Sequence, residues 1–305
     1  MKRGVPLTLS PLLAMAALLV AGTMPAWSQS GPVAGVPAKE LFGAATAPAP
    51  LAPRSIGFYS KGCLAGGTAL PVTGPGRDGP LWQAMRPSRN RNWGHPELVD
   101  FIERFARTVP TVSRWSGILV GDMAQPRGGP MRTGHASHQI GLDVDVWLTP
   151  SPGRELDRAT RETLSATMVV RPDRLDVDPK VWTPDHVAVI RAAAQDRDVE
   201  RVLVNAAIKK ALCRDAKGDR GWLAKVRPYW GHDYHMHVRL SCPPGNSECR
   251  PQEPPPVGDG CGADLAWWFT DEVLHPKPPK EPAKPKPPLT LADLPEACAV
   301  VLETR

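Results

Sequence analysis

The chain has 305 residues, a formal net charge of +6 at pH 7 and 42% hydrophobic residues. This length suits one large domain or two tightly joined ones. A mild positive charge suits an anionic polymer as partner. No basic cluster is interleaved with aromatic residues, so we expect no nucleic-acid partner.

The first 28 residues have the pattern of a secretory signal peptide. Lys2 and Arg3 precede a largely apolar run at 7–20, and a small-x-small cleavage site follows at 26–28. The run is interrupted and short for a membrane span, so an uncleaved anchor is the less favoured alternative. We expect a soluble mature chain with no transmembrane segment.

Composition divides the rest of the chain into three parts. Residues 29–53 are rich in Ala, Pro and Gly and predict a flexible leader. Residues 276–290 are low in complexity and predict an extended polyproline segment. The folded domain is therefore expected at 54–275, followed by a Pro/Lys-rich tail at 276–305.

The domain alternates between helical and strand patterns. Helices are predicted at 96–108, where apolar residues recur at helical spacing, at 184–194 after a capping Thr183, and at 206–212. Strands are predicted at 116–123, 143–148, 200–204 and 234–240. This order favours an α+β fold with a mainly antiparallel sheet that carries a site on one face and helices on the other.

Five of the eight histidines lie in two short stretches, 135–148 and 232–240. Each stretch ends in a strand-like alternation of apolar and polar residues. Side chains on a strand repeat every two residues, so Asp143 and Asp145 share one face, and His235 and His237 share another. If the two strands are neighbours, these side chains offer the three N/O ligands of a catalytic zinc site.

Each of these residues could instead have a structural role, because a lone histidine on a strand is usually a hydrogen-bonded core or surface residue. Two separate clusters are harder to explain in that way. The intervening residues of both strands are apolar, so the polar faces point together away from a core. Other catalytic signatures are missing: the sequence contains no Ser-His-Asp elbow, catalytic-cysteine motif or phosphate-binding loop.

Longer strings resemble one family of zinc peptidases. They include HASHQIGLDVDVWL at 135–148, VNAAIKKALCRDA at 204–216, RPYWGHDYHMHVRLSCP at 227–243 and GDGCGADLAWWF at 258–269. The spacing from His138 to Asp145, followed by H-x-H, resembles the lysostaphin/D-Ala-D-Ala-carboxypeptidase/hedgehog group. Within that group, the strings resemble the penicillin-insensitive murein endopeptidases over nearly all of the mature chain.

The resemblance implies a role for each site residue. The residues that match the family's zinc ligands are His138, Asp145 and His237. The residue that matches His235 assists catalysis, and those that match His135 and His232 line the site. From spacing alone, His235 could bind the metal in place of His237.

Other roles stay open from the sequence. His135 could bind substrate, support a ligand or bind a second metal, although the region that contains Asp173, Asp176, Asp178 and His186 departs from the family's pattern. Asp143 could hold a ligand imidazole in place or serve a structural hydrogen bond. Arg239 and Arg227 could bind carboxylates of a peptide stem or form ion pairs. His95 and Trp230 could line a cleft.

Six cysteines in an exported chain point to three disulfides. Cys242 and Cys249 flank a short loop and should pair locally. The sequence alone does not decide how the other four cysteines pair; they are Cys63, Cys213, Cys261 and Cys298. The resemblance implies Cys213–Cys261 and Cys63–Cys298, with the second bridge anchoring the tail.

The resulting hypothesis is a periplasmic zinc endopeptidase that hydrolyses D-alanyl-meso-diaminopimelyl cross-links between peptidoglycan peptide stems. One alternative keeps the zinc and changes the bond, as in a carboxypeptidase or amidase of the same polymer. Another is a cell-wall binding protein with structural zinc. Structural zinc sites normally have four protein ligands, so three ligands and a free His235 favour catalysis.

Overall fold

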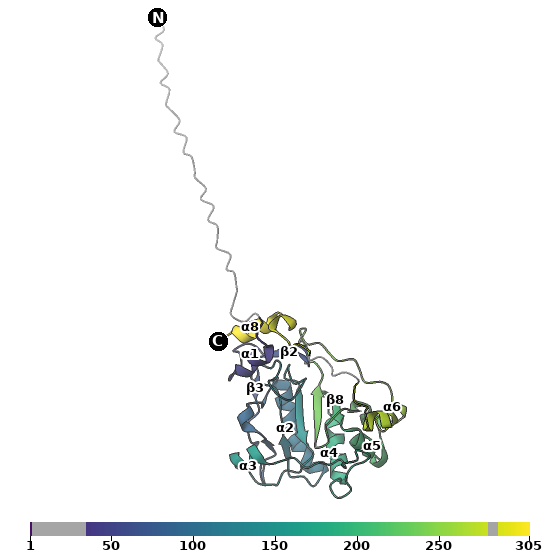
Figure 1. Ribbon diagram of the computed structural model, residues 1–305. Coiled ribbons are helices and arrows are strands. Elements are labelled where there is room, and N and C mark those ends of the chain that lie inside the picture. The colour runs from purple at the N-terminus through teal and green to yellow at the C-terminus, as the bar shows by residue number, and fades with distance from the viewer. Residues whose placement is uncertain (2–34, 280–285) are drawn as a thin grey trace. The chain divides into compact units, whose positions relative to one another are not determined.

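The computed structural model describes residues 35–279 and 286–305, together with Met1 (Figure 1). The predicted signal peptide at 1–28 and the first residues of the predicted leader lie outside the described residues. Part of the predicted polyproline segment at 276–290 does so as well. Within the described residues, no helix combines the length and the apolar character needed to cross a membrane.

A six-stranded sheet carries the centre of the fold. In spatial order its strands are β4 (Trp82–Ala84), β6 (Ile118–Val120), β7 (Asp143–Trp147), β10 (His235–Leu240), β8 (Val199–Val204) and β9 (Val226–Pro228). The pairings β6–β7, β7–β10 and β10–β8 are antiparallel, whereas the outer pairings β4–β6 and β8–β9 are parallel. The predicted mainly antiparallel sheet is therefore a mixed sheet with an antiparallel centre.

Helical crossovers explain the two parallel pairings. The long helices are α2 (Pro96–Val112), α4 (Pro184–Gln195) and α5 (Ala206–Asp215). The chain passes from β4 to β6 through α2, and from β8 to β9 through α5. A parallel neighbour needs such a connection, while a short turn produces an antiparallel neighbour. The three helices begin where the sequence predicted and extend beyond the predicted ends.

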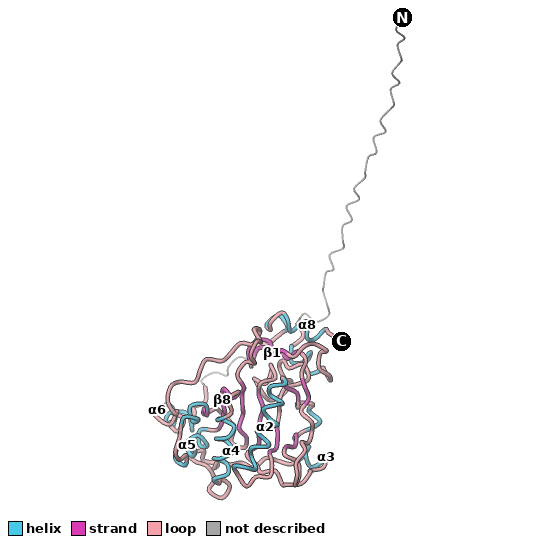
Figure 2. The backbone as a smooth tube through the Cα atoms, turned by 180° about the vertical axis from the view of Figure 1, so that it is seen from behind, coloured by secondary structure: helices cyan, strands magenta, loops and turns pink. Residues whose placement is uncertain are grey.

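The apolar sides of helices and sheet form one core. Leu98, Phe101 and Ile102 of α2 are fully buried, as are Val144 of β7 and Val238 of β10. Helix α2 packs against α4, which in turn contacts β8 (Figure 2). Because successive strand residues point to opposite faces, burying the valines on this core turns Asp145 and His237 to the other face of the sheet.

A smaller cluster joins the two ends of the described chain. It contains helices α1 (Ala38–Ala44) and α8 (Ala297–Glu303), drawn in purple and yellow in Figure 1, and the hairpin of β1 (Arg54–Phe58) and β2 (Lys61–Ala65). Phe42 and Val301 are fully buried there. Residues 38–44, predicted as part of a flexible leader, thus form a packed helix, because Ala38 and Phe42 lie four residues apart on one helical face.

The remaining elements are short and connect the larger ones. They are β3 (Thr68–Ala69), η1 (Pro87–Arg89), β5 (Trp93–Gly94), α3 (Arg158–Thr163), η2 (Gly221–Lys225), α6 (Ala263–Trp267), α7 (Asp271–Leu274) and η3 (Leu291–Asp293). Strands β3 and β5 pair as a separate two-stranded sheet. The segment η1 and the strands β4 and β6 border the site described below.

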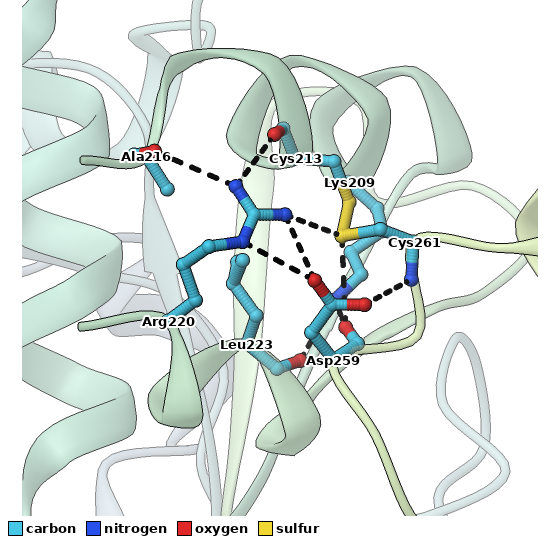
Figure 3. Close-up of a disulfide and its surroundings, with 7 residues drawn as sticks. All are labelled: Lys209, Cys213, Ala216, Arg220, Leu223, Asp259 and Cys261. Carbon is cyan, nitrogen blue, oxygen red and sulfur yellow. Dashed lines mark hydrogen bonds and ion pairs between the residues drawn. A yellow bond between two sulfur atoms is a disulfide. The ribbon is translucent and has the colours of Figure 1, made fainter. Parts of the chain in front are cut away.

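Three disulfides staple this fold, as predicted. They join Cys63 to Cys298, Cys213 to Cys261, and Cys242 to Cys249. The first bridge links β2 to α8 across 235 residues of sequence. The second links the end of α5 to the loop before α6, where side chains around Asp259 add further bonds (Figure 3).

Candidate metal centre

The two histidine-rich stretches meet at adjacent strands in the middle of the sheet. In the register of β7 and β10, His237 lies opposite Asp145 and Arg239 lies opposite Asp143. The Nδ1 atom of His237 is 3.2 Å from Oδ1 of Asp145. The neighbouring strands expected from the sequence are therefore present, and they bring a carboxylate and an imidazole together without any contribution from a loop.

His138 reaches the same carboxylate from the loop that precedes β7. Its Nε2 lies 3.4 Å from Asp145 Oδ1, and its ring is fully buried. The backbone of His138 has φ = 64°, in the left-handed region that a residue with a Cβ atom rarely adopts. Its backbone N–H donates to Oδ2 of Asp143 at 3.1 Å. Strained backbone of this kind persists where the surroundings enforce it, often at functional sites.

Among the described residues, one group has the geometry to hold a metal ion. Ligand atoms of His135, His138 and Asp145 all lie within 4.8 Å of one another. This group shares His138 and Asp145 with the ligand set that the resemblance implies, and it has His135 where that set has His237. The His138 ring is close to both alternatives, with centroid distances of 4.3 Å to His135 and 4.6 Å to His237.

The hydrogen bonding of these atoms fits a metal. Both ring nitrogens of His138 and Oδ1 of Asp145 are buried without a hydrogen-bond partner among the described residues. Leaving a buried polar group unpaired costs about 1–3 kcal/mol. A cation bound between them would satisfy a nitrogen and the carboxylate oxygen together. Two or three imidazoles with one carboxylate is a donor set typical of zinc.

Asp143 contacts the candidate ligand His237 on the side away from Asp145. Its Oδ1 accepts from Nε2 of His237 at 2.9 Å and from Nε of Arg239 at 2.6 Å. A metal-binding histidine commonly donates its second N–H to a carboxylate, which sets the orientation of the ring. Burial alone would raise the pKa of Asp143, but the positive charge of Arg239 and the contact with His237 hold it well below its ordinary value.

His235 and His232 lie at the edge of this group. His235 has its Nε2 3.6 Å from Asp145 Oδ1, and it also lines the adjoining cleft. Its Nδ1 is buried without a partner among the described residues. The His232 ring is 4.8 Å from that of His235, and its Nδ1 lies 2.8 Å from the carbonyl oxygen of Trp230. Burial and the nearby histidines lower the pKa of His232 to about 4.

The pKa values of His237 and His235 are shifted in opposite directions. Burial alone would lower the pKa of His237, but Asp143 and Asp145 raise it to about 9. Burial lowers the pKa of His235, against the opposing attraction of Asp145. The carboxylates therefore act most strongly on the residue that lies between them.

A cleft of about 280 Å³ opens beside the metal group. Its lining includes His135, Asp145 and His235 together with Asp122, Tyr234, Trp147, Arg86, Arg89, Ser165 and Met168. Several of these residues were not predicted. A signal for Asp122 was that it is the one acidic residue in the largely apolar strand predicted at 116–123, and a signal for the arginines was their clustering within residues 86–91.

Asp122 is the most densely bonded of the residues that the sequence analysis missed. Its Oδ2 accepts from Arg91 at 2.9 Å and from Arg89 at 3.0 Å, and it lies 3.0 Å from Nε2 of His135. Burial alone would raise the pKa of Asp122, but the bond to His135 and the two arginines lower it to about 2. The contact orients His135, whose Nε2 is also 3.4 Å from Asp145 Oδ2.

The structure places the two arginines proposed for substrate binding away from the cleft lining. The guanidinium of Arg239 is buried, bonded to Asp143 and Gln252, and lies 3.5 Å from the ring centroid of Tyr59. Arg227 is on β9 at the sheet edge, near Gly260. Arg239 therefore holds Asp143 in place through a buried contact and does not line the cleft.

Other polar residues considered in the sequence have structural contacts. His95 caps α2 by accepting the N–H of Glu97, and His186 caps α4 through its contact with Thr183. Asp176 pairs with Arg214. Among the described residues, no second group with metal-binding geometry accompanies the first. Trp230 is half exposed and packs against Trp268 at a centroid distance of 4.8 Å.

Comparison with known proteins gives a consistent assignment. The sequence model of the family described as penicillin-insensitive murein endopeptidase matches residues 55–303. Curated relatives with the same description are 42% identical over 258 residues in Klebsiella pneumoniae (82% of this chain, 86% of the relative) and 42% identical over 259 residues in Pectobacterium atrosepticum (82% and 84%). A relative from Escherichia coli is 42% identical over 270 residues, 85% of this chain and 89% of its own length.

Proposed function

The chain belongs to the penicillin-insensitive murein endopeptidase family, and we propose that it is a periplasmic zinc endopeptidase that hydrolyses peptide cross-links of peptidoglycan. The observation that carries the zinc assignment is the fully buried His138, both of whose ring nitrogens have no partner among the described residues, beside the unpaired Oδ1 of Asp145. Asp145, unlike the fully buried His138, also lines a cleft of about 280 Å³.

His138, Asp145 and His237 are the proposed ligands. His237 fits this role because its Nε2 donates to Asp143 while its Nδ1 is directed at Asp145. His135 is the alternative third ligand, but the same Nε2 atom contacts both Asp122 and Asp145, so it lacks the second-nitrogen support that Asp143 gives His237. When bound, zinc would polarise the scissile carbonyl and lower the pKa of a coordinated water from 15.7 to about 7.

His235 is the proposed general base. It lies on the same strand face as His237, lines the cleft, and is 3.6 Å from the proposed ligand Asp145. Burial lowers its pKa, so the imidazole is neutral at pH 7 and can accept a proton from water. The same group would then deliver that proton to the leaving amine. His232, next to it, would orient its ring or contact substrate.

The proposed scissile bond joins D-alanine to the side-chain amine of meso-diaminopimelate in the neighbouring stem. This proposal comes from the family resemblance and from the cell-wall polymer named in the relatives' description. A mechanism of this kind forms no acyl-serine, so β-lactams have no nucleophile to acylate. The three disulfides agree with an oxidising compartment such as the periplasm.

Digestion of purified sacculi tests this function. Zinc-loaded mature protein should release un-cross-linked stems, identified by mass spectrometry, and a chelator should abolish the release. Loss of a terminal D-alanine, or separation of stem from sugar, would instead identify a carboxypeptidase or an amidase. Sacculi that bind the protein and stay intact would identify a binding protein.

A further inference from the structure

We propose that Arg86, with Arg89, forms a carboxylate-binding subsite in the cleft. This subsite selects cross-links in which the nitrogen of the scissile amide is attached to a carbon that bears a free carboxylate. The inference rests on the proposed endopeptidase function and adds to it a determinant of substrate choice. Both arginines line the same cleft as His135, Asp145 and His235.

The first observation is that Arg86 is held in place. Its backbone N–H donates to the carbonyl of Arg161 at 3.0 Å. Its Nη1 donates to the carbonyls of Arg161 and Glu162. The guanidinium also lies 5.6 Å from the ring centroid of Trp147, a further residue of the cleft lining. A side chain ordered before binding loses little conformational entropy when a ligand arrives.

The second observation is that Arg86 forms no close ion pair with a described residue, although the Glu162 carboxylate lies near enough to interact with its charge. Within the described part of the chain, no carboxylate oxygen lies within 4.0 Å of its guanidinium nitrogens, although Arg89 and Arg91 both reach Asp122. The side-chain hydrogen bonds of Arg86 to described residues go to carbonyl oxygens and use only Nη1. A guanidinium offers five donors in a planar fork that fits a carboxylate, so donors remain for a ligand.

The third observation is the strain of the backbone that presents these arginines. Arg86 has φ = 57° and Asn90 has φ = 51°, both in the left-handed region, at the two ends of η1. The Glu162 carboxylate holds this segment by accepting from the backbone N–H of Ser88 at 3.0 Å and from its hydroxyl at 2.5 Å. Strained residues that neighbouring contacts enforce occur preferentially at ligand-binding sites.

Arg89 adds a second positive charge to the lining. Its side chain is 47% exposed, and its Nη1 is 3.0 Å from Asp122. That carboxylate also accepts from Arg91 and contacts His135, so one negative charge is shared among several donors. If Asp145 binds the metal, the positive charges of Arg86 and Arg89 make their side of the cleft suitable for binding an anion.

The proposed substrate has a carboxylate at the required place. In a D-alanyl-meso-diaminopimelyl cross-link, the scissile nitrogen is attached to a carbon that bears a free carboxylate. In a lysine cross-link the equivalent carbon bears only hydrogens, and amidation of the diaminopimelate removes the charge. A charge-assisted bond to this carboxylate would therefore favour the free meso-diaminopimelyl cross-link by about 10- to 100-fold.

The experiment compares three cross-linked stem dimers that carry free meso-diaminopimelate, diaminopimelate amidated at that carboxylate, or lysine. kcat/KM is measured for zinc-loaded wild type, Arg86→Gln, Arg86→Lys and Arg107→Gln. Arg107 is a matched control on α2, 55% exposed and paired with Glu103. Zinc content and thermal unfolding show whether each variant is folded.

Wild type should prefer the free carboxylate over the amide by about 10-fold or more, and Arg86→Gln should bring the ratio near one. Arg86→Lys should keep part of the preference, because it keeps the charge without the fork. Arg107→Gln should keep the wild-type ratio. Equal cleavage of the three dimers by wild type, or an unchanged ratio in Arg86→Gln, would overturn the subsite while leaving the endopeptidase function intact.

A binding measurement separates the subsite from the reaction. The Kd of the free and amidated dimers is measured for His235→Ala, with and without Arg86→Gln. Tighter binding of the free-carboxylate dimer that disappears with Arg86→Gln supports the subsite. This holds even if wild type cleaves no dimer, and that absence of cleavage would refute only the proposed function. Equal Kd values in the His235→Ala background overturn the subsite.

Discussion

At the scale of single residues, the histidines of the candidate metal centre differ in the hydrogen-bond partners of their ring nitrogens. His237 has one nitrogen on Asp143 and the other directed at Asp145, whereas both ring nitrogens of the buried His138 have no hydrogen-bond partner among the described residues. His235 lines the cleft, and its Nε2 is 3.6 Å from Asp145. These differences are the basis for proposing His237 and His138 as metal ligands and His235 as the base.

We predict that His235→Ala keeps its zinc and loses activity, and that His237→Ala loses both. General acid–base assistance contributes about 10²–10⁴-fold, so cross-link cleavage by His235→Ala should fall by that factor. Zinc content by elemental analysis is measured beside cleavage. His275→Ala, which changes a histidine after α7, is the matched control and should resemble wild type.

Two outcomes would change these assignments. Zinc lost from His235→Ala and retained by His237→Ala would exchange the two roles. If His237→Ala keeps its zinc and His135→Ala loses it, the third ligand is His135, as the compact group of His135, His138 and Asp145 allows.

We predict that Asp143→Asn lowers zinc affinity by about 10- to 100-fold, the usual effect of losing a carboxylate behind a histidine ligand. The motivation is that Asp143 accepts from His237 and from the backbone N–H of His138. Competition with a chelator of known affinity measures the change. Asp100→Asn, on the exposed side of α2, is the control.

Asp143→Asn also leaves the buried Arg239 without its carboxylate, and breaking a buried pair costs about 3–5 kcal/mol of unfolding free energy. Thermal unfolding must therefore show that the variant is folded at the assay temperature. Unchanged zinc affinity in a folded variant would contradict the supporting role of Asp143.

At the scale of elements, α5, η2 and the loop before α6 are tied together away from the centre (Figure 3). Lys209 is fully buried, and its Nζ donates to the carbonyls of Leu223 at 2.7 Å and Asp259 at 2.5 Å. Arg220 bonds the Asp259 carboxylate at 2.8 Å beside the Cys213–Cys261 bridge. Burial, and then the positive charge of Arg227, lowers the pKa of Lys209 to about 7 against the attraction of Asp259.

We predict that this lysine makes the fold more stable as pH rises above 7. Between about pH 7 and the ordinary lysine value of 10.5, the unfolded chain holds more protons at Lys209 than the folded chain. Stability rises with pH wherever the unfolded state binds more protons. Below pH 7 both states are protonated, and the cost of burying the charge is fully present.

The test compares urea unfolding of wild type and Lys209→Met at about pH 6 and about pH 9. The free energy of unfolding of wild type, relative to the variant, should increase from the lower to the higher pH. Lys210→Met removes an exposed amine from the same helix and is the matched control. A difference between wild type and Lys209→Met that is constant or shrinks with pH would count against the lowered pKa.

At the scale of the whole molecule, the two ends of the described chain depend on one cross-link. Cys63 on β2 and Cys298 on α8 are both fully buried within the cluster that contains Phe42 and Val301. Arg127 adds hydrogen bonds to the carbonyls of Val301 and Leu302 at 2.7 Å each. The bridge closes a loop that includes the six-stranded sheet and the candidate metal centre.

We predict that removing Cys63–Cys298 destabilises the protein more than removing Cys242–Cys249. The sequence separations are 235 and 7 residues. The chain-entropy relation gives about 5 kcal/mol for the long loop and about 2–3 kcal/mol for the short one. Paired Cys→Ala variants are compared by chemical unfolding, and equal losses would show that loop entropy is not the main contribution.

Local patterns in the sequence determined much of this protein. The apolar spacing of α2 and the alternation of β7 and β10 depend only on near neighbours, so the three long helices and the strands β6, β7, β8 and β10 followed from them. The crowding of histidines predicted in the same way that His237 and Asp145 would meet. The local pairing of Cys242 with Cys249 did so for the same reason. The family resemblance supplied the two long-range disulfides.

Only the tertiary structure decided which side chains converge from distant segments. Asp122, Arg86 and Arg89 reach the cleft because β6 pairs with β7 and β4 pairs with β6. The spacing of residues within 82–122 does not reveal which strands become neighbours. For Arg239 the sequence left substrate binding and an ion pair open, and its contacts with Asp143, Gln252 and Tyr59 bury it behind the centre. A sequence pattern specifies the face of a strand, whereas the packing of other elements on that face determines whether a charged group meets solvent, substrate or a buried partner.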